Sequence, residues 1–250
     1  MTANDLLGSS LVYLGLLAMA TGGFAVLRPL RWLRLSPRRR GALLMGAGFV
    51  SLLLGMAVPA PLRHSAGSTR LDRSLPDYQF SEFHETEVQA SSAAIHRAIW
   101  QVTASEIRLF RVFTWIRSPH LSGRRKPTIL SAPTDRPILE VATSSGFHQL
   151  ADEENEVVVG TAVIAPRGLR ATGDLRKIPG LALAVMSFRT EPLDANRCRL
   201  TTETRIFATD PTTYYRFKAY WRLIAPGSAI LRDTWLQAIR KRAERQAAGR

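Results

Sequence analysis

The sequence predicts an α+β protein in which two transmembrane helices precede a domain built from an antiparallel sheet and a long C-terminal helix. The membrane part is predicted by two runs of 22 residues, 6–27 and 41–62, that contain no charged side chain. The domain is predicted by the pattern after residue 76, where apolar residues recur with a period of two and then with helical spacing.

Each uncharged run is long enough to cross a bilayer. At about 1.5 Å per residue, 22 helical residues reach roughly 33 Å, against a hydrocarbon core of about 30 Å. The first run is a poor signal peptide because the residues before it contain an acid and no Lys or Arg. A signal peptide with a single span, and two buried helices of a soluble protein, remain as alternatives. Small residues with the spacing of closely packed membrane helices are Ala18, Gly22 and Ala25 in the first run and Ala47, Ser51 and Gly55 in the second.

The segment between the two runs, RPLRWLRLSPRRR at 28–40, carries six arginines and no acid. Arginines in short loops between membrane spans are retained on the cytoplasmic side. The sequence therefore predicts a multi-pass protein of the cell membrane whose N-terminus and C-terminal domain both lie outside the cytoplasm.

Charge and motif content exclude several function classes. The formal net charge is +14, but no RNA-binding run or DNA-recognition helix accompanies it, so nucleic acid is not an expected partner. The single cysteine, Cys198, excludes an intrachain disulfide and a multi-cysteine zinc site. The chain has no HExxH, GxSxG or Walker A motif. We therefore expect no metal, no cofactor and no assembled catalytic group.

The chain divides by composition into four parts. Residues 1–62 form the transmembrane hairpin, 63–75 a linker, 76–246 the folded domain and 247–250 a tail. The linker is predicted to be solvated because HSAGSTRLDRSL is small, polar and non-periodic.

The domain begins with a strand and two short helices. Phe80, His84, Thr86 and Val88 alternate onto one face of the strand. Ser91 or Ser92 then caps a helix, and TASE at 103–106 has the spacing of a capping box before a second helix. Five further strands are predicted at 137–142, 146–151, 156–165, 181–193 and 197–208, and their short connections favour an antiparallel sheet.

The last element is a long helix. Asp210 and Pro211 have the preferred residue types for its cap and first turn. We expect the helix to bend or break at Pro226 and to place Trp221 and Trp235 in the core.

Two stretches carry a resemblance to a known family: YQFSEFHETEVQASSAAIHRAIWQVTASEIRLFRVFTWIR at 78–117 and FKAYWRLIAPGSAILRDTWLQAIRKRAE at 217–244. With the order of elements between them, they resemble the START-related helix-grip superfamily (SRPBCC), which includes Bet v 1-like proteins and polyketide cyclases. The resemblance implies a helix-grip fold, a curved antiparallel sheet around a long C-terminal helix. It also implies a cavity for apolar ligands between sheet and helix, and it implies no universal catalytic residue.

Polar residues that could enter such a cavity are the ligand-site candidates. They are His84, Glu140, His148, Thr202 and Thr204. Glu203 and Arg205 are two residues apart on one strand, and we expect them to form a charge pattern facing solvent.

Two basic loops are candidates for contact with anionic lipid headgroups, although solvated loops are an equal alternative. Their residues are Arg124, Arg125, Lys126, Arg167, Arg170, Arg176 and Lys177.

The sequence thus favours a membrane-tethered domain that binds a lipid or another apolar small molecule. One alternative is a cyclase- or aromatase-type enzyme acting on an apolar substrate, with His84 or Glu203 as acid or base. Another is a structural or regulatory envelope protein that binds a second protein.

Overall fold

The computed structural model of the chain describes residues 2–28, 38–112, 133, 135–166, 168 and 173–249. These residues form two compact units. The first unit combines Met1–Pro61 with Tyr215–Pro226, and the second combines Leu62–Tyr214 with Gly227–Arg250.

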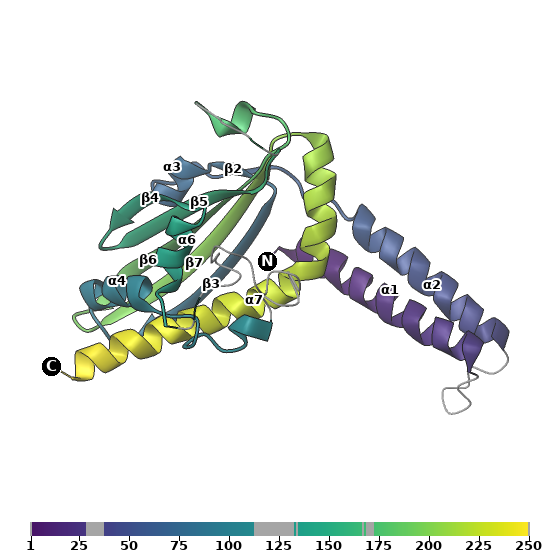
Figure 1. The fold of residues 1–250 in the computed structure, drawn as a ribbon, viewed down its shortest axis with the longest axis horizontal. Coiled ribbons are helices and arrows are strands. Elements are labelled where there is room, and N and C mark those ends of the chain that lie inside the picture. Colours follow the sequence, from purple (N-terminus) through teal and green to yellow (C-terminus); the bar gives the residue numbers. More distant parts are fainter. Residues whose placement is uncertain are drawn as a thin grey trace. The chain divides into compact units, whose positions relative to one another are not determined.

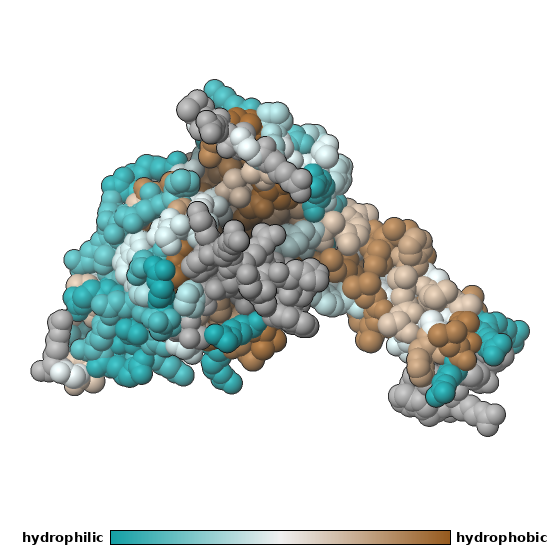
Figure 2. Space-filling view, in the orientation of Figure 1, coloured by the Kyte–Doolittle hydropathy of each residue, from teal (hydrophilic) through white to brown (hydrophobic). Residues whose placement is uncertain are grey.

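The first unit contains the two N-terminal helices, α1 (Ala3–Leu27) and α2 (Arg38–Ala57), lying side by side (Figure 1). Both are long and apolar enough to cross a membrane. The second helix ends five residues before the predicted end of its span at residue 62. The reason is Pro59 and Pro61, which cannot continue a helix. Figure 2 shows apolar side chains over the outside of the two helices. Leu14, Leu17 and Leu43 are among the exposed ones.

Glycines form the contact between α1 and α2. They face one another in three pairs, Gly8 with Gly55, Gly15 with Gly48, and Gly22 with Gly41, at intervals of seven residues along each helix. A Cβ atom added at Gly15 would lie 2.6 Å from the carbonyl oxygen of Gly48, so no other residue fits there. The predicted small residues Ala18, Gly22, Ala25 and Gly55 take part in these contacts, whereas Ala47 is exposed.

The segment Tyr215–Pro226 groups with the N-terminal helices, which the sequence did not predict. Its Arg222 is fully buried, and Nη1 donates to Asp5 Oδ1 at 3.1 Å. Nη2 donates to the carbonyl oxygen of Val58 at 3.1 Å, just past the end of α2. The guanidinium lies against Gly8, where a Cβ would be 2.5 Å from Arg222 Cζ. One buried arginine therefore joins the start of α1 to the end of α2.

The second unit is built on an antiparallel sheet in the order β3-β7-β6-β5-β4 (Figure 1). The predicted hairpins are confirmed. The strands are β3 (Phe80–Val88), β4 (His148–Glu153), β5 (Glu156–Ile164), β6 (Ala182–Asp194) and β7 (Arg197–Ala208). A separate two-stranded ribbon pairs β1 (Arg63–His64) with β2 (Asp77–Tyr78).

The main core lies on one face of this sheet, which we call the inner face. It is covered by α4 (Ser92–Gln101), α6 (Ile138–Ser144) and the part of α7 (Pro211–Ala248) after Pro226. Ile95 and Ile99 of α4 and Trp235 and Ile239 of α7 pack against the sheet. Phe188 of β6 meets Trp235 edge-on at 5.2 Å between ring centroids. With a single curved antiparallel sheet and a long C-terminal helix on its inner face, the domain has the helix-grip architecture.

The prediction of a strand at 137–142 is wrong, because these residues form α6. Ile138, Leu139, Val141 and Ala142 are buried with helical spacing, and packing against α4 overrides their preference for strand. An ion pair between Arg136 and Glu140, four residues apart, supports the first turn.

The prediction of a solvated linker at 63–75 is wrong for its second half. Residues Arg70–Ser74 form α3, with Thr69 and Asp72 as a capping box. Leu71 and Leu75 are buried against the face of the sheet opposite α7, which we call the outer face. Leu71 and Leu75 therefore attach residues 70–75 to the sheet, although the polar composition of this segment predicted that it is exposed to solvent.

The start of α7 agrees with the prediction. Asp210 caps the helix by accepting from Thr213 N at 3.0 Å, and its second oxygen accepts from Gly180 N at 2.7 Å. Hydrogen bonds from the Thr213 side chain and backbone and from Gly180 lower the pKa of Asp210 to about 2. The helix does not break at Pro226, although the boundary between the two units falls there.

Candidate functional site

The antiparallel register of β3 and β7 gathers polar residues on the inner face. Glu82 lies opposite Thr204, and His84 lies opposite Thr202. Alternation gives these four side chains the same face as the core residues Phe80, Val88 and Leu200. We call these four residues, together with Ser228 of α7, the inner-face group.

The Glu82 carboxylate is the centre of the group and is only 1% exposed. His84 Nε2 lies 2.9 Å from Glu82 Oε1, and Ser228 Oγ donates to Glu82 Oε2 at 2.7 Å. An ionised carboxylate only accepts hydrogen bonds, so Nε2 of His84 carries a proton in that state. The carboxylate is therefore held from two sides, by the sheet and by the long helix.

Two hydroxyls of the inner-face group lack a hydrogen-bond partner among the described residues. Thr202 Oγ1 and Thr204 Oγ1 are buried, and neither has a hydrogen-bond partner in the described part of the chain. A buried polar atom left without a partner costs about 1–3 kcal/mol. The two atoms lie two residues apart on the same face of β7.

Apolar side chains surround the group. Met186 and Phe188 of β6 are the register neighbours of Thr204 and Thr202. From α7, the Arg232 guanidinium donates to the Met186 sulfur and lies 5.4 Å from the centroid of the Trp235 ring. The inner face therefore offers a few polar groups within an otherwise apolar environment.

No family model and no curated protein matches this chain. Among solved structures, the protein TTHA0849 from Thermus thermophilus is 10% identical, with 68% of this chain and 100% of that chain covered at a TM-score of 0.28. The Zhui aromatase/cyclase from Streptomyces sp. R1128 is 14% identical, with 67% and 95% covered at a TM-score of 0.27. Values this low say nothing about ligand or activity, so the fold assignment rests on the sheet order and the long helix of this chain.

Of the five predicted ligand-site residues, His84, Thr202 and Thr204 meet on the inner face. Glu140 does not, because its segment is a helix and its side chain points to solvent beside Arg136. His148 begins β4 and lines a separate pocket on the outer face. Glu82 was not among the predicted site residues, although the alternation that places His84 on this face also places Glu82 there. An acid between Phe80 and His84 on an apolar face was the available signal.

Glu203 and Arg205 were expected to form a charge pattern facing solvent. The ion pair is present, but the prediction that Arg205 is exposed is wrong. The two side chains do bind each other on the outer face, with Arg205 Nε 2.7 Å from Glu203 Oε1. Arg205 is buried, however, because α3 covers it. Its Nη1 donates to Asp72 Oδ1 at 2.8 Å, and its guanidinium lies 4.7 Å from the centroid of the Tyr78 ring.

Asp72 is the most strongly perturbed acid of this network. Burial raises its pKa, but hydrogen bonds from Ser65, Thr69 and Arg205 outweigh burial and hold the pKa well below its usual range. Asp72 therefore stays ionised and fixes α3 to the sheet.

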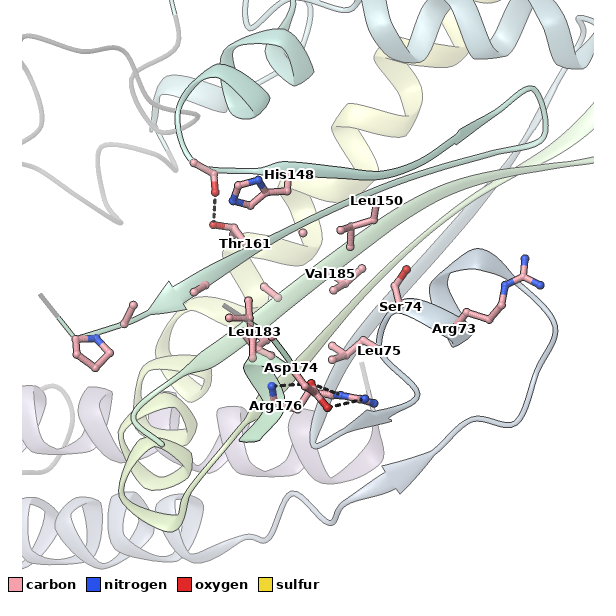
Figure 3. A pocket seen from close by; sticks show the side chains of 18 of the residues that line it. Arg73, Ser74, Leu75, His148, Leu150, Thr161, Asp174, Arg176, Leu183 and Val185 are labelled. Carbon is pink, nitrogen blue, oxygen red and sulfur yellow. Dashed lines mark hydrogen bonds and ion pairs between the residues drawn. The ribbon is translucent and has the colours of Figure 1, made fainter. Parts of the chain in front are cut away.

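The outer face also carries a pocket of about 790 Å³ beside α3, drawn in Figure 3. Strands β4, β5 and β6 form one side of it, and α3 and the short helix η3 (Leu175–Lys177) border it. This pocket therefore lies on the opposite face of the sheet from the position, between sheet and long helix, where the family resemblance implies a cavity.

Of the predicted membrane-surface residues, Arg176 and Lys177 lie exposed on η3. The hydrogen bond to Asp174 raises the pKa of Arg176. The remaining five lie outside the described residues: Arg124, Arg125, Lys126, Arg167 and Arg170.

Proposed function

We propose that this protein is a membrane-anchored binding domain for an apolar small molecule or lipid that carries hydrogen-bonding groups. The observation that carries the proposal is the pair of unpartnered hydroxyls, Thr202 Oγ1 and Thr204 Oγ1, beside the buried Glu82. A ligand oxygen or nitrogen would satisfy them, while Met186 and Phe188 would contact its apolar body.

Anchoring by α1 and α2 is supported by their length and by their outward side chains. Leu17 is 65% exposed and Leu43 is 72% exposed, which is unfavourable in water and favourable in lipid. The arginine-rich segment 28–40 supports an orientation with the loop in the cytoplasm and the domain outside.

A cyclase- or aromatase-type activity is the second candidate, and one contact favours it. His84 and Glu82 form a 2.9 Å acid–base pair on the inner face, where a bound substrate would reach it. Glu203, the other acid considered, faces away from the inner face and is bound to Arg205. An enzyme built on this site would therefore use the Glu82–His84 pair.

Native mass spectrometry of the full-length protein, with organic extraction of the same sample, tests the binding function. The wild type should carry an additional mass that the solvent removes. A Thr202→Val/Thr204→Val variant preserves shape but removes both hydroxyls, so its occupancy should fall about tenfold, as for loss of one to two hydrogen bonds.

Thr201→Val is the matched control. Thr201 lies on the outer face of the same strand, and its hydroxyl already bonds to the Arg189 carbonyl oxygen. This variant should keep the ligand. Equal occupancy in all three proteins, or no bound mass in the wild type, would remove the binding proposal. Conversion of the extracted molecule by wild type but not by His84→Gln would favour the enzyme.

A further inference from the structure

We propose that the pocket on the outer face is a second binding site, for a single-chain amphiphile with an anionic head. The pocket does not belong to the inner-face group. Leu183 and Val185 of β6 point into it, whereas Met186 and Phe188 on the same strand point to the inner face. The sheet therefore separates the two sites.

The middle of the pocket is apolar. Its walls are Leu75 directly after α3, Leu150 of β4, and Leu183 and Val185 of β6 (Figure 3). Gly160 of β5 leaves the floor open, because a Cβ there would lie 2.8 Å from Leu150 Cδ1 and 3.3 Å from Val185 Cγ2. The volume of about 790 Å³ lies within the roughly 300–1,000 Å³ of small-molecule sites.

The polar groups lie around this apolar middle, and most of them already form hydrogen bonds within the protein. Thr161 Oγ1 donates to the Gly146 carbonyl oxygen at 2.8 Å. Asp174 and Arg176 neutralise each other through two hydrogen bonds of 2.9 and 3.0 Å.

Arg73 is different. It lines the pocket from α3, is exposed, and has no acidic partner in the described part of the chain. Among the described residues, the pocket thus has apolar walls and one cation without an acidic partner, Arg73, whose side chain points away from Leu75 and Val185 in Figure 3. A cation beside apolar walls complements a molecule with an alkyl chain and an anionic head.

The position of Arg73 in the chain favours an amphiphile taken from the bilayer, a step that rests on the proposed membrane anchoring. Arg73 follows the end of α2, Ala57, by 16 residues. A chain of this length spans at most about 55 Å when fully extended. The chain length thus limits how far Arg73 can lie from the end of α2.

Photo-crosslinking of the full-length protein in phosphatidylcholine nanodiscs tests this site. The probes are diazirine-labelled palmitate, lysophosphatidylglycerol and hexadecanol, and labelled peptides are mapped by mass spectrometry. Either anionic probe should label the peptides that contain Leu75, Leu150 and Val185 about tenfold more than the alcohol, as for one charge-assisted contact. The more strongly labelling anion identifies the head.

Arg73→Glu should abolish this preference for anions, and Arg108→Glu should retain it. Arg108 is a matched control because it is exposed and does not line the pocket. Circular dichroism checks that each variant is folded, and Arg73→Gln replaces Arg73→Glu if the latter is not. Equal labelling by all three probes in the wild type, or equal preference in the Arg73 and Arg108 variants, would overturn the proposal. So would labels confined to inner-face peptides.

Discussion

Replacing Asp72 with Asn should destabilise the C-terminal domain strongly. Asp72 is 7% exposed and accepts from four donors: Ser65 Oγ at 2.6 Å, Thr69 Oγ1 at 2.6 Å, Thr69 N at 3.1 Å and Arg205 Nη1 at 2.8 Å. The amide of Asn has half the acceptor capacity and no charge. Arg205, which is 5% exposed, would lose one of its two carboxylates.

The size of the effect can be worked out from these contacts. Breaking a buried ion pair by removing one partner costs about 3–5 kcal/mol. Because Glu203 remains bound to Arg205, we expect the lower end, about 3 kcal/mol. For a domain of this size, 1 kcal/mol corresponds to about 2–4 °C in Tm, so Tm should fall by about 6–12 °C.

Thermal unfolding of the full-length protein in a non-ionic detergent, followed by near-ultraviolet circular dichroism, measures this change. Asp174→Asn is the matched control, because Asp174 also binds an arginine but at the exposed η3. It should leave Tm nearly unchanged. A Tm for the Asp72 variant within 1 °C of the wild type would refute the assignment of α3 to the folded domain.

The same carboxylate predicts a pH dependence. The pKa of Asp72 is lowered in the folded state from its ordinary value of 3.8, so its contribution to stability is present in full above that pH. It decreases as the pH falls below 3.8 toward the folded-state pKa. The Tm difference between wild type and Asp72→Asn should therefore be constant from pH 5 to 7 and shrink below pH 4. A Tm difference that increases as the pH falls below 4 would contradict the lowered pKa of Asp72.

Two further predictions concern the hairpin. Gly48→Leu should lower Tm and yield, because Gly48 meets the backbone of Gly15 at the contact of α1 and α2. Gly46→Leu should lower neither, because a Cβ added at Gly46 has no neighbour within 4 Å in the described part of the chain. Equal losses of Tm and yield in the two variants, measured by fluorescence-detected size exclusion, would contradict this packing of the helices. An alkaline phosphatase fusion after Arg250 should be active and a green fluorescent protein fusion dark, and the opposite pair of results would reverse the orientation.

Much of the fold could be predicted because period-two and helical patterns were clear. Thr202 and Thr204 alternate with charged residues on β7, and the face they share is the buried face observed. The errors came from tertiary packing. Ile138 to Ala142 prefer strand but pack as a helix against α4, and the small residues around α3 hid Leu71 and Leu75 as anchors.

The candidate site was harder to predict for a related reason. Glu82 was not among the residues predicted for the inner face, and Arg205 was expected to face solvent. Both are buried because partners from distant segments compensate them: Ser228 from α7 for Glu82, and Asp72 from α3 for Arg205. Such pairings are set by the register and by docking of helices, so spacing along the chain does not encode them.

A ligand held by Thr202 and Thr204 on the inner face should be visible in a crystal or cryo-electron microscopy structure of the full-length protein, purified from its own membranes. We expect non-protein density within hydrogen-bond distance of both Oγ1 atoms, continuing past Met186 and Phe188 as an apolar body. Only ordered water on these hydroxyls, with side chains filling the remaining space, would contradict it.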